Sequence, residues 1–197
     1  MITNKEQLKE YLEADLSVAH VPHNPIKRYL LMLHGNEQCH TFRYVKCLRK
    51  MEYYMNTGNK LLYHLYYWRL SRLGLRYNLR VEYNVIGTGL SIIHLAGGGG
   101  CILNCNKMGE FCVVQAGVVL GSVRDGEHRP YVGDHVCFGL GAKAYGLIHI
   151  GNCVHVLPNA VVTKDIPDNC IVGGVPAKII RKYTAEEIDN ILKYNRF

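Results

Sequence analysis

The sequence contains no apolar run that could cross a membrane. Its apolar stretches, such as 29–33 and 61–68, are far shorter than the roughly 20 residues that a membrane helix needs. The first ten residues carry two lysines and two glutamates where a secretory signal needs an apolar core. We therefore expect neither a transmembrane helix nor a signal peptide.

Cysteine is too sparse, at eight in 197 residues, for a secreted scaffold held together by disulfides. We therefore expect reduced thiols and a cytoplasmic protein. The Cys-x-x-Cys spacing of zinc sites is missing as well, since three residues separate Cys101 from Cys105. The four glycines 97–100 are not followed by the Lys-Ser or Lys-Thr pair of a phosphate loop. We expect no metal site and no nucleotide loop of that kind.

Acidic residues are outnumbered, 16 to 23, which leaves a formal net charge of +7. A basic field concentrates anions such as phosphates, nucleic acids or acidic lipids near a surface. Basic helix faces are, however, more often ordinary solvated surfaces. The charge alone therefore identifies no partner.

The first 78 residues have the pattern of helices. Asn4 with Gln7 forms a capping pattern for a helix through about residue 16, and Asn24 before Pro25 begins a second helix that Gly35 would stop. Two longer helices, 37–55 and 60–76, follow as a hairpin. Its interleaved basic and aromatic residues could suggest nucleic-acid binding. We favour packed aromatics with the basic side chains outside, and expect no nucleic-acid partner.

From about residue 85 a six-residue period replaces the helical one. One row of apolar residues recurs every six positions, at Met108, Val114, Leu120, Val132, Phe138, Ala144, Ile150, Val156 and Val162. A second row lies four residues after each of these except Leu120, at Cys112, Val118, Val136, Ala142, Ile148, Val154, Ala160 and Ile166. A helix would drift out of this period within two turns.

Hexapeptides of this kind predict a parallel β-helix, in which short strands bury their apolar faces only by stacking coil upon coil. The expected fold class is mainly β, a parallel β-helix with an N-terminal α-helical segment. We divide the chain into a helical segment at 1–78, the β-helix at 79–182 and a C-terminal helix at 183–197.

Two stretches break the repeat, at 93–107 and 121–131. Insertions into a solenoid form loops on one face, and that face is often where ligands bind. His94 lies at the start of the first stretch and His128 lies in the second. These two histidines are therefore the candidates for chemistry, whereas His135, His149 and His155 fall at outward positions of regular hexads.

Four segments carry a resemblance to a known family. They are Ile86-Gly-Thr-Gly-Leu-Ser-Ile-Ile-His94, Gln115-Ala-Gly-Val-Val-Leu-Gly-Ser122, Gly139-Leu-Gly-Ala-Lys143 and Gly174-Val-Pro-Ala-Lys-Ile-Ile180. Over about residues 80–182 the chain resembles the hexapeptide-repeat acyltransferases, specifically the serine O-acetyltransferases. The resemblance implies a left-handed β-helix, an exception to the usual right-handed crossover. It also implies a homotrimer or a pair of trimers, with active sites between neighbouring subunits.

The resemblance further implies acetyl-CoA as cosubstrate and His94 as the general base, with His128 as a second histidine. A neutral imidazole would take the proton of an acceptor hydroxyl as it attacks the thioester. Acetyl-CoA would lie along the later coils, where its candidate contacts are Gly141, Ala142, Lys143, Lys164, Lys178 and Arg181. In the loop at 121–131, Arg124 and Arg129 are candidates for substrate binding. No metal is expected, because the six-residue spacing of His149 and His155 differs from that of the β-helix carbonic anhydrases.

The chain departs from the serine-specific pattern in three places. The family's aspartate before the catalytic histidine is Ile93 here, and the aspartate fifteen residues earlier, which orients that histidine, is Leu79. Glu82 is the nearest carboxylate that could replace it. The family's Arg-His-Pro is His128-Arg129-Pro130 in this chain, so either residue could occupy the histidine's place.

These departures, with a helical segment much shorter than in bacterial serine acetyltransferases, favour a saccharide hydroxyl as the acceptor. L-Serine, as in cysteine biosynthesis, is the first alternative. The second is a trimeric scaffold without enzymatic activity, which would use the basic helical hairpin as its docking surface.

Overall fold

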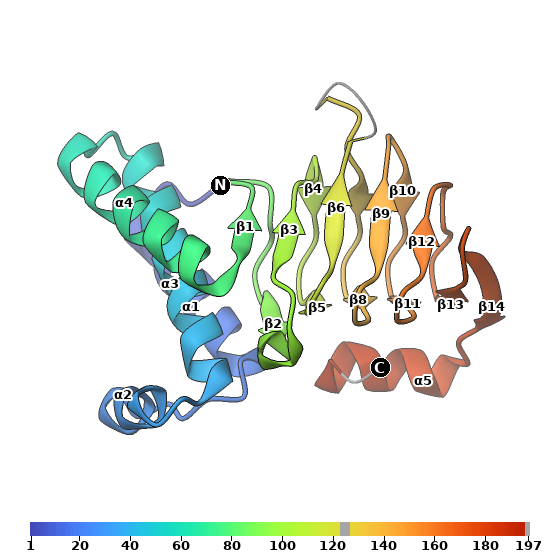
Figure 1. Cartoon of the computed structure of the whole chain (residues 1–197), viewed down its shortest axis with the longest axis horizontal. Helices are drawn as coiled ribbons and strands as arrows, with labels where there is room; N and C mark the ends of the chain where they lie inside the picture. Colours follow the sequence, from blue (N-terminus) through green and yellow to red (C-terminus); the bar gives the residue numbers. More distant parts are fainter. Residues whose placement is uncertain (123–126, 196–197) are drawn as a thin grey trace.

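The computed structural model describes residues 1–122 and 127–195. A group of four helices stands at one end of a stack of short strands, and a fifth helix follows the last strand (Figure 1). The helices are α1 (Lys5–Val18), α2 (Pro25–Leu33), α3 (Glu37–Asn56), α4 (Lys60–Tyr77) and α5 (Ala185–Tyr194), with a short 3₁₀ turn, η1, at Leu95–Gly97.

The helices begin where the polar caps place them. The side chains of Asn4 and Asn24 accept backbone N–H groups of the first turns of α1 and α2. Asn36 and Asn59 cap α3 and α4 in the same way. The four N-terminal helices predicted from the sequence are confirmed, with ends that differ by at most about two residues.

The strands form three sheets that wind as the faces of a prism. The five-stranded sheet contains β1 (Leu79–Val81), β3 (Cys101–Leu103), β6 (Val119–Gly121), β9 (Lys143–Tyr145) and β12 (Val161–Val162). The three-stranded sheet contains β4 (Lys107–Met108), β7 (Tyr131–Val132) and β10 (His149–Ile150). The six-stranded sheet contains β2 (Ser91–Ile93), β5 (Val113–Gln115), β8 (Cys137–Phe138), β11 (Val154–Val156), β13 (Cys170–Gly173) and β14 (Lys178–Lys182).

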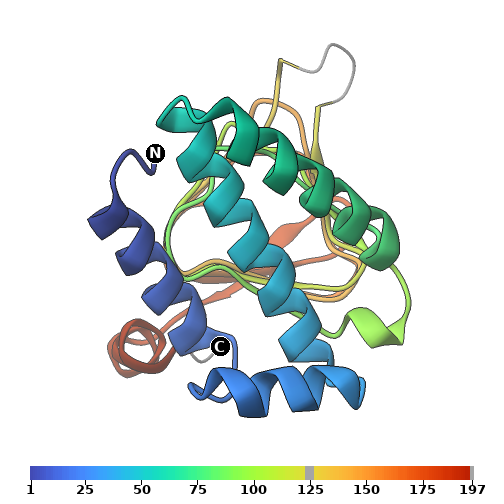
Figure 2. The same ribbon diagram turned by 90° about the vertical axis from the view of Figure 1, so that its left-hand side faces the viewer.

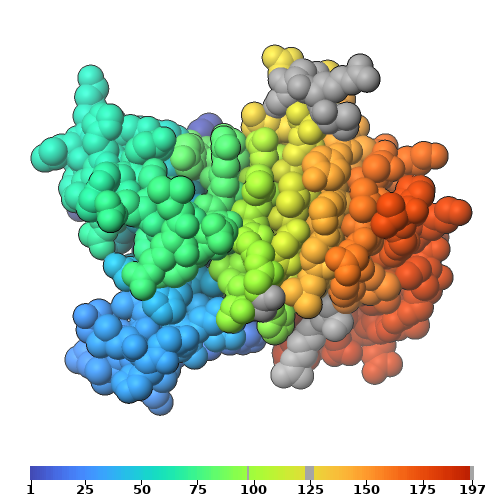
Figure 3. Space-filling model, in the orientation of Figure 1, coloured from blue at the N-terminus to red at the C-terminus, as the bar shows by residue number. Residues whose placement is uncertain are grey.

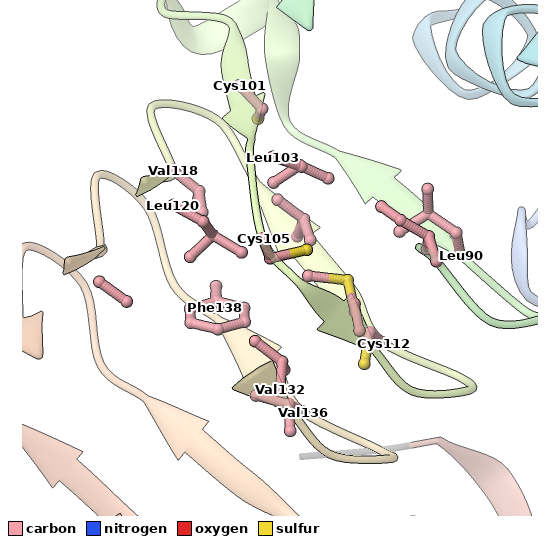
Figure 4. Packing of buried hydrophobic residues seen from close by; sticks show 14 of the residues in the cluster. Leu90, Cys101, Leu103, Cys105, Cys112, Val118, Leu120, Val132, Val136 and Phe138 are labelled. Carbon is pink, nitrogen blue, oxygen red and sulfur yellow. The ribbon is translucent and has the colours of Figure 1, made fainter. Parts of the chain in front are cut away.

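Pairing within each sheet is parallel and joins successive coils, except that β14 runs antiparallel to β13. Both predicted apolar rows are buried, from Met108 and Cys112 to Val162 and Ile166. Figure 4 shows how they meet in the centre, where the ring of Phe138 lies beside Leu120 and Val132. The parallel β-helix predicted from the six-residue period is confirmed.

The helices close the N-terminal end of the prism. Seen from that end, α3 and α4 cross the triangle of strands, α1 runs along its left side and α2 lies at its lower edge (Figure 2). The helices cover the inner face of the first coil, which would otherwise be exposed. Leu48 and Met51 of α3 share one apolar core with Ile86 and Ile92. The helical segment therefore supplies the cap that a solenoid needs at its open end.

One basic residue of the hairpin lies inside rather than outside. Arg49 is fully buried, with Nε 2.9 Å from Asp15 Oδ2 of α1 and Nη1 3.4 Å from Glu52 Oε2. Nη1 also donates to the carbonyl oxygen of Ile86 at 2.9 Å, and Asp15 Oδ1 accepts the Leu90 N–H at 3.0 Å. The expectation that the hairpin's basic side chains all face solvent is wrong for Arg49, which ties α1 and α3 to the first coil.

The hairpin's aromatic residues are only partly packed. Tyr44 is buried, but Trp68 is 57% exposed, with the Arg72 guanidinium 5.3 Å from its ring.

In the described part of the chain, no helix combines the length and apolar character that crossing a membrane requires.

Candidate active site

Most of the predicted site residues lie at two corners of the prism, which flank the same five-stranded sheet. The His94 corner consists of the turns in which the chain leaves the six-stranded sheet and enters the five-stranded one. These turns are residues 94–100, 116–118, 139–142 and 157–160. The loop corner follows the five-stranded sheet and comprises residues 82–85, 104–106, 127–130, 146–148 and 163–165 of the described chain. Arg124 lies outside the described residues.

His94 is an exposed residue at the end of β2. Its backbone is left-handed, with φ of 63°, an uncommon conformation for a residue with a side chain. The next residue, Leu95, donates its backbone N–H to Glu37 Oε1 in the first turn of α3. The helical segment therefore holds the turn that presents the imidazole.

A column of glycines continues from this turn along the corner. Gly99, Gly117 and Gly141 all have positive φ, at 99°, 77° and 69°. A Cβ on Gly99 would lie 3.5 Å from the Cα of Gly117, and one on Gly117 would lie 3.2 Å from the Cα of Gly141. Successive coils therefore approach one another closely at this corner, and its surface along these three glycines is backbone without side chains.

The Gly141-Ala142-Lys143 segment lies two coils beyond His94, about 10 Å along the prism at about 4.8 Å per coil. Ala142 is fully buried, so its side chain faces the core. Lys143 is half-buried at the start of β9, and its Nζ donates to the Gly141 carbonyl at 2.8 Å. Lys143 is thus the residue of this segment whose side chain can reach a ligand.

The other predicted cofactor contacts are dispersed. Lys164 is exposed at the loop corner, across the five-stranded sheet from Gly141. Lys178 and Arg181 lie on β14, which is exposed throughout. Arg181 holds Glu187 of α5 through two hydrogen bonds of 2.7 and 2.9 Å, and this guanidinium lowers the pKa of Glu187 to about 2.

The loop corner brings Glu82 and Arg129 together, with 3.5 Å between Oε2 and Nη1. His128, which directly precedes Arg129, is exposed. Neither Glu82 nor His128 shares a corner with His94 within one chain. The carboxylate that contacts the His94 turn is Glu37, which the sequence analysis did not single out.

A cleft of about 310 Å³ opens between this turn and the helices. Its walls are the starts and ends of neighbouring elements: Gly35, Glu37, His40, Thr41, Arg76, Tyr77, Asn78, Leu95, Ala96 and 98–100. His40 Nδ1 lies 2.8 Å from the Tyr77 hydroxyl, and burial together with nearby Arg76 lowers the pKa of His40. In the space-filling view the green turn lies against the blue lobe of α2 and the start of α3 (Figure 3).

The remaining histidines differ in their surroundings. His149 is exposed and stacks on Tyr131 with ring centroids 4.9 Å apart. His155 is not on an open surface: it lines a cavity of about 250 Å³ under α5, and burial lowers its pKa. Across residues 1–122 and 127–195, no cluster of three or more His, Cys, Asp or Glu side chains is placed to hold a metal ion.

Sequence comparison gives a consistent set of matches. The chain is 35% identical over 97 residues to a protein of Synechococcus elongatus and 38% identical over 98 residues to one of Mycobacterium tuberculosis, which covers 48% and 49% of the chain. A third match, from Buchnera aphidicola of Acyrthosiphon pisum, is 30% identical over 168 residues and covers 78% of the chain. All three are named serine acetyltransferase. The predicted resemblance is thereby confirmed.

The chain's relatives are serine acetyltransferases. It spans only 39%, 42% and 57% of the length of these three. A scan against models of known families finds no match.

Solved structures agree on the fold. The serine acetyltransferase of Brucella abortus has a TM-score of 0.69 at 21% identity, over 91% of this chain and 71% of that one. The Neisseria gonorrhoeae enzyme in complex with serine has a TM-score of 0.68 at 25% identity, over 90% and 70%. A Brucella abortus structure in complex with coenzyme A has a TM-score of 0.65 at 22% identity, over 91% and 70%. The predicted left-handed β-helix with N-terminal helices is confirmed.

Proposed function

We propose that this chain transfers an acetyl group from acetyl-CoA to an acceptor hydroxyl, with His94 as the general base. The observation that carries the proposal is the His94 corner. An exposed histidine stands there at the head of a column of closely stacked glycines, Gly99, Gly117 and Gly141, which ends beside Lys143. We propose that a long thioester lies along this bare backbone with its acyl end at the imidazole.

The chemistry needs one proton relay. Neutral His94 accepts the hydroxyl proton while the hydroxyl oxygen attacks the thioester carbonyl, and the tetrahedral adduct then expels the CoA thiolate. The protonated imidazole returns the proton to that sulfur, so the products are an acetyl ester and free CoA. A general base of this kind contributes about 10²- to 10⁴-fold in rate.

Basic side chains would hold the phosphates of acetyl-CoA. Lys143 is closest to the glycine column, and Lys178 and Arg181 are at the far end of the prism. Gly141 and Ala142 would contribute the backbone that lets CoA approach closely. Lys164 stands at the other corner, so we propose that it contacts CoA bound to a neighbouring subunit.

For the acceptor, the comparisons favour L-serine, the alternative in the sequence analysis, rather than a saccharide hydroxyl. The serine acetyltransferase names of the relatives support this choice. The departures at Ile93 and Leu79 then require that other residues bind serine and orient the base.

The placement of two corners beside one sheet supports a homotrimer, or a dimer of trimers, with shared sites. In a cyclic trimer the contact is head-to-tail, so one subunit's His94 corner can face its neighbour's loop corner. We propose that His128, Arg124 and Arg129 act on the neighbour's substrate, with Glu82 holding Arg129. A cytoplasmic location is part of the proposal, and all eight cysteines, each within the described residues, are free thiols.

The decisive assay follows thiol release from acetyl-CoA with L-serine and with a panel of saccharides. We expect serine-dependent release that His94→Ala lowers by at least about 10²-fold, while the matched variant His149→Ala, an exposed histidine on another sheet, keeps wild-type activity. If no acceptor drives release and CoA does not stabilise the folded protein, the scaffold alternative replaces the enzyme.

A further inference from the structure

The cleft beside His94 has the charge pattern of an amino-acid site. It is lined by one guanidinium, from Arg76, and one carboxylate, from Glu37, with the His40–Tyr77 hydrogen-bonded pair also in its wall. A zwitterionic amino acid carries the complementary charges on neighbouring groups. A neutral sugar can form hydrogen bonds with both groups through its hydroxyls, but it has no opposite charges to pair with them.

We propose that this cleft is the acceptor subsite, in which Arg76 binds the α-carboxylate of serine and Glu37 its ammonium group. This inference rests on the proposed function, because it takes His94 as the base. It assigns to the helical segment the task that the family's aspartate, replaced here by Ile93, would otherwise perform.

The position of the cleft supports the proposal. Leu95, the residue after His94, forms part of its wall, so the cleft opens one residue from the backbone of the proposed base. At about 310 Å³ the cleft is at the small end of ordinary ligand pockets. An amino acid fits such a volume, whereas an oligosaccharide would extend far outside it.

Glu37 has two tasks in this arrangement. Its Oε1 already accepts the Leu95 N–H and thereby fixes the turn of the base. A carboxylate can accept several hydrogen bonds, so the same group can also receive an ammonium N–H. Glu37 is therefore a positioning residue for His94 as well as a binding residue for serine.

Arg76→Ala tests the carboxylate contact. Hydrogen bonds to charged groups contribute about 1.5–3 kcal/mol, so we expect the KM for serine to rise about 10- to 100-fold with the KM for acetyl-CoA unchanged. L-Serinamide, which lacks the carboxylate, should react equally well with wild type and variant. The control is Arg72→Ala, one helical turn earlier and stacked on exposed Trp68, which should leave both KM values unchanged.

Glu37→Gln tests the ammonium contact while keeping an oxygen that can accept the Leu95 N–H. We expect a higher KM for serine with kcat largely retained, and loss of the preference for serine over 3-hydroxypropionate, which lacks the ammonium group. Glu37→Ala should lower kcat as well, because the turn is released. An unchanged KM for serine in Glu37→Gln, with its preference for serine over 3-hydroxypropionate intact, would overturn the binding role.

Calorimetric titration with L-serine separates this inference from the proposed function. If wild type binds serine and Arg76→Ala does not, the subsite stands even where no acetyl transfer is found. If serine is acetylated and Arg76→Ala changes neither its affinity nor its KM, the subsite is overturned while the function stands. If wild type does not bind serine at millimolar concentration, the subsite is overturned outright.

Discussion

The buried Arg49 offers the sharpest test of how the helical segment is joined to the β-helix. Arg49→Met keeps much of the side-chain volume but removes the guanidinium. Two carboxylates, Asp15 and Glu52, and the carbonyl oxygens of Ile86 and Gly87 then lose their donor. Breaking a buried ion pair on one side costs about 3–5 kcal/mol, because the partner charge remains buried without compensation.

A loss of that size is a large share of the roughly 5–15 kcal/mol by which typical domains are stable. Urea denaturation at a fixed protein concentration measures it, as a fall in the free energy of unfolding. Arg72→Met is the control, since its exposed guanidinium should matter by less than about 0.5 kcal/mol. A loss below about 1 kcal/mol in Arg49→Met would refute the reasoning, because it would mean that solvent reaches the two carboxylates.

The stability lost in Arg49→Met should also depend on pH. Burial raises the pKa of Glu52 above its ordinary value in the folded protein. A carboxyl with a raised folded pKa binds its proton more tightly in the folded state, so its contribution to stability falls as pH rises through that interval. Without Arg49 the anion is penalised further, and the deficit of Arg49→Met relative to wild type should therefore shrink as pH falls from 7 towards 4.5.

Three other predictions follow from single contacts. Arg181→Ala should return the pKa of Glu187 from about 2 towards 4.5 in an NMR titration; because this pKa is depressed, the stability that it contributes is present above 4.5 and lost as pH falls towards 2. Gly141→Ala should destabilise the fold by more than about 1 kcal/mol, because its Cβ would lie 2.4 Å from Oδ1 of Asn159. Gly58→Ala is the control: its φ is similar but it has open space around it, so it should lower the stability less in the same thermal melt. Cys112, whose pKa burial raises to about 12, should react with a thiol reagent only as fast as the protein unfolds, and faster labelling in native buffer would contradict its burial.

The fold could be predicted because it depends on patterns between residues that are close together in the sequence. The rows from Val132 to Val162 repeat without a change of phase, and only stacked coils bury every sixth residue. The helix starts at Asn4 and Asn24 were equally visible, because a cap is a contact between residues three or fewer positions apart.

Long-range pairings were not visible in this way. Arg49 looked like any other basic residue of a helix, and its partner Asp15 comes 34 residues earlier on another helix. Lys164 and Gly141 likewise looked like members of one ligand site because both lie in the repeat. Counting hexads shows instead that a residue's corner depends on its position within a coil of three hexads, and these two fall at different corners.

The candidate site also shows why the helical segment cannot be regarded as a passive cap. The prism supplies a strand end for His94 and a floor of glycine backbone, but its own sequence has Ile93 and Leu79 where charged groups would bind the acceptor and orient the base. Glu37 at the start of α3 holds the turn after His94 from outside the repeat, and Arg76 at the end of α4 lines the adjoining cleft, which we propose as the acceptor subsite. Because Arg49 fixes α3 to the first coil, substitutions that loosen that ion cluster should weaken serine binding more than the binding of CoA, for which we propose a site further along the prism.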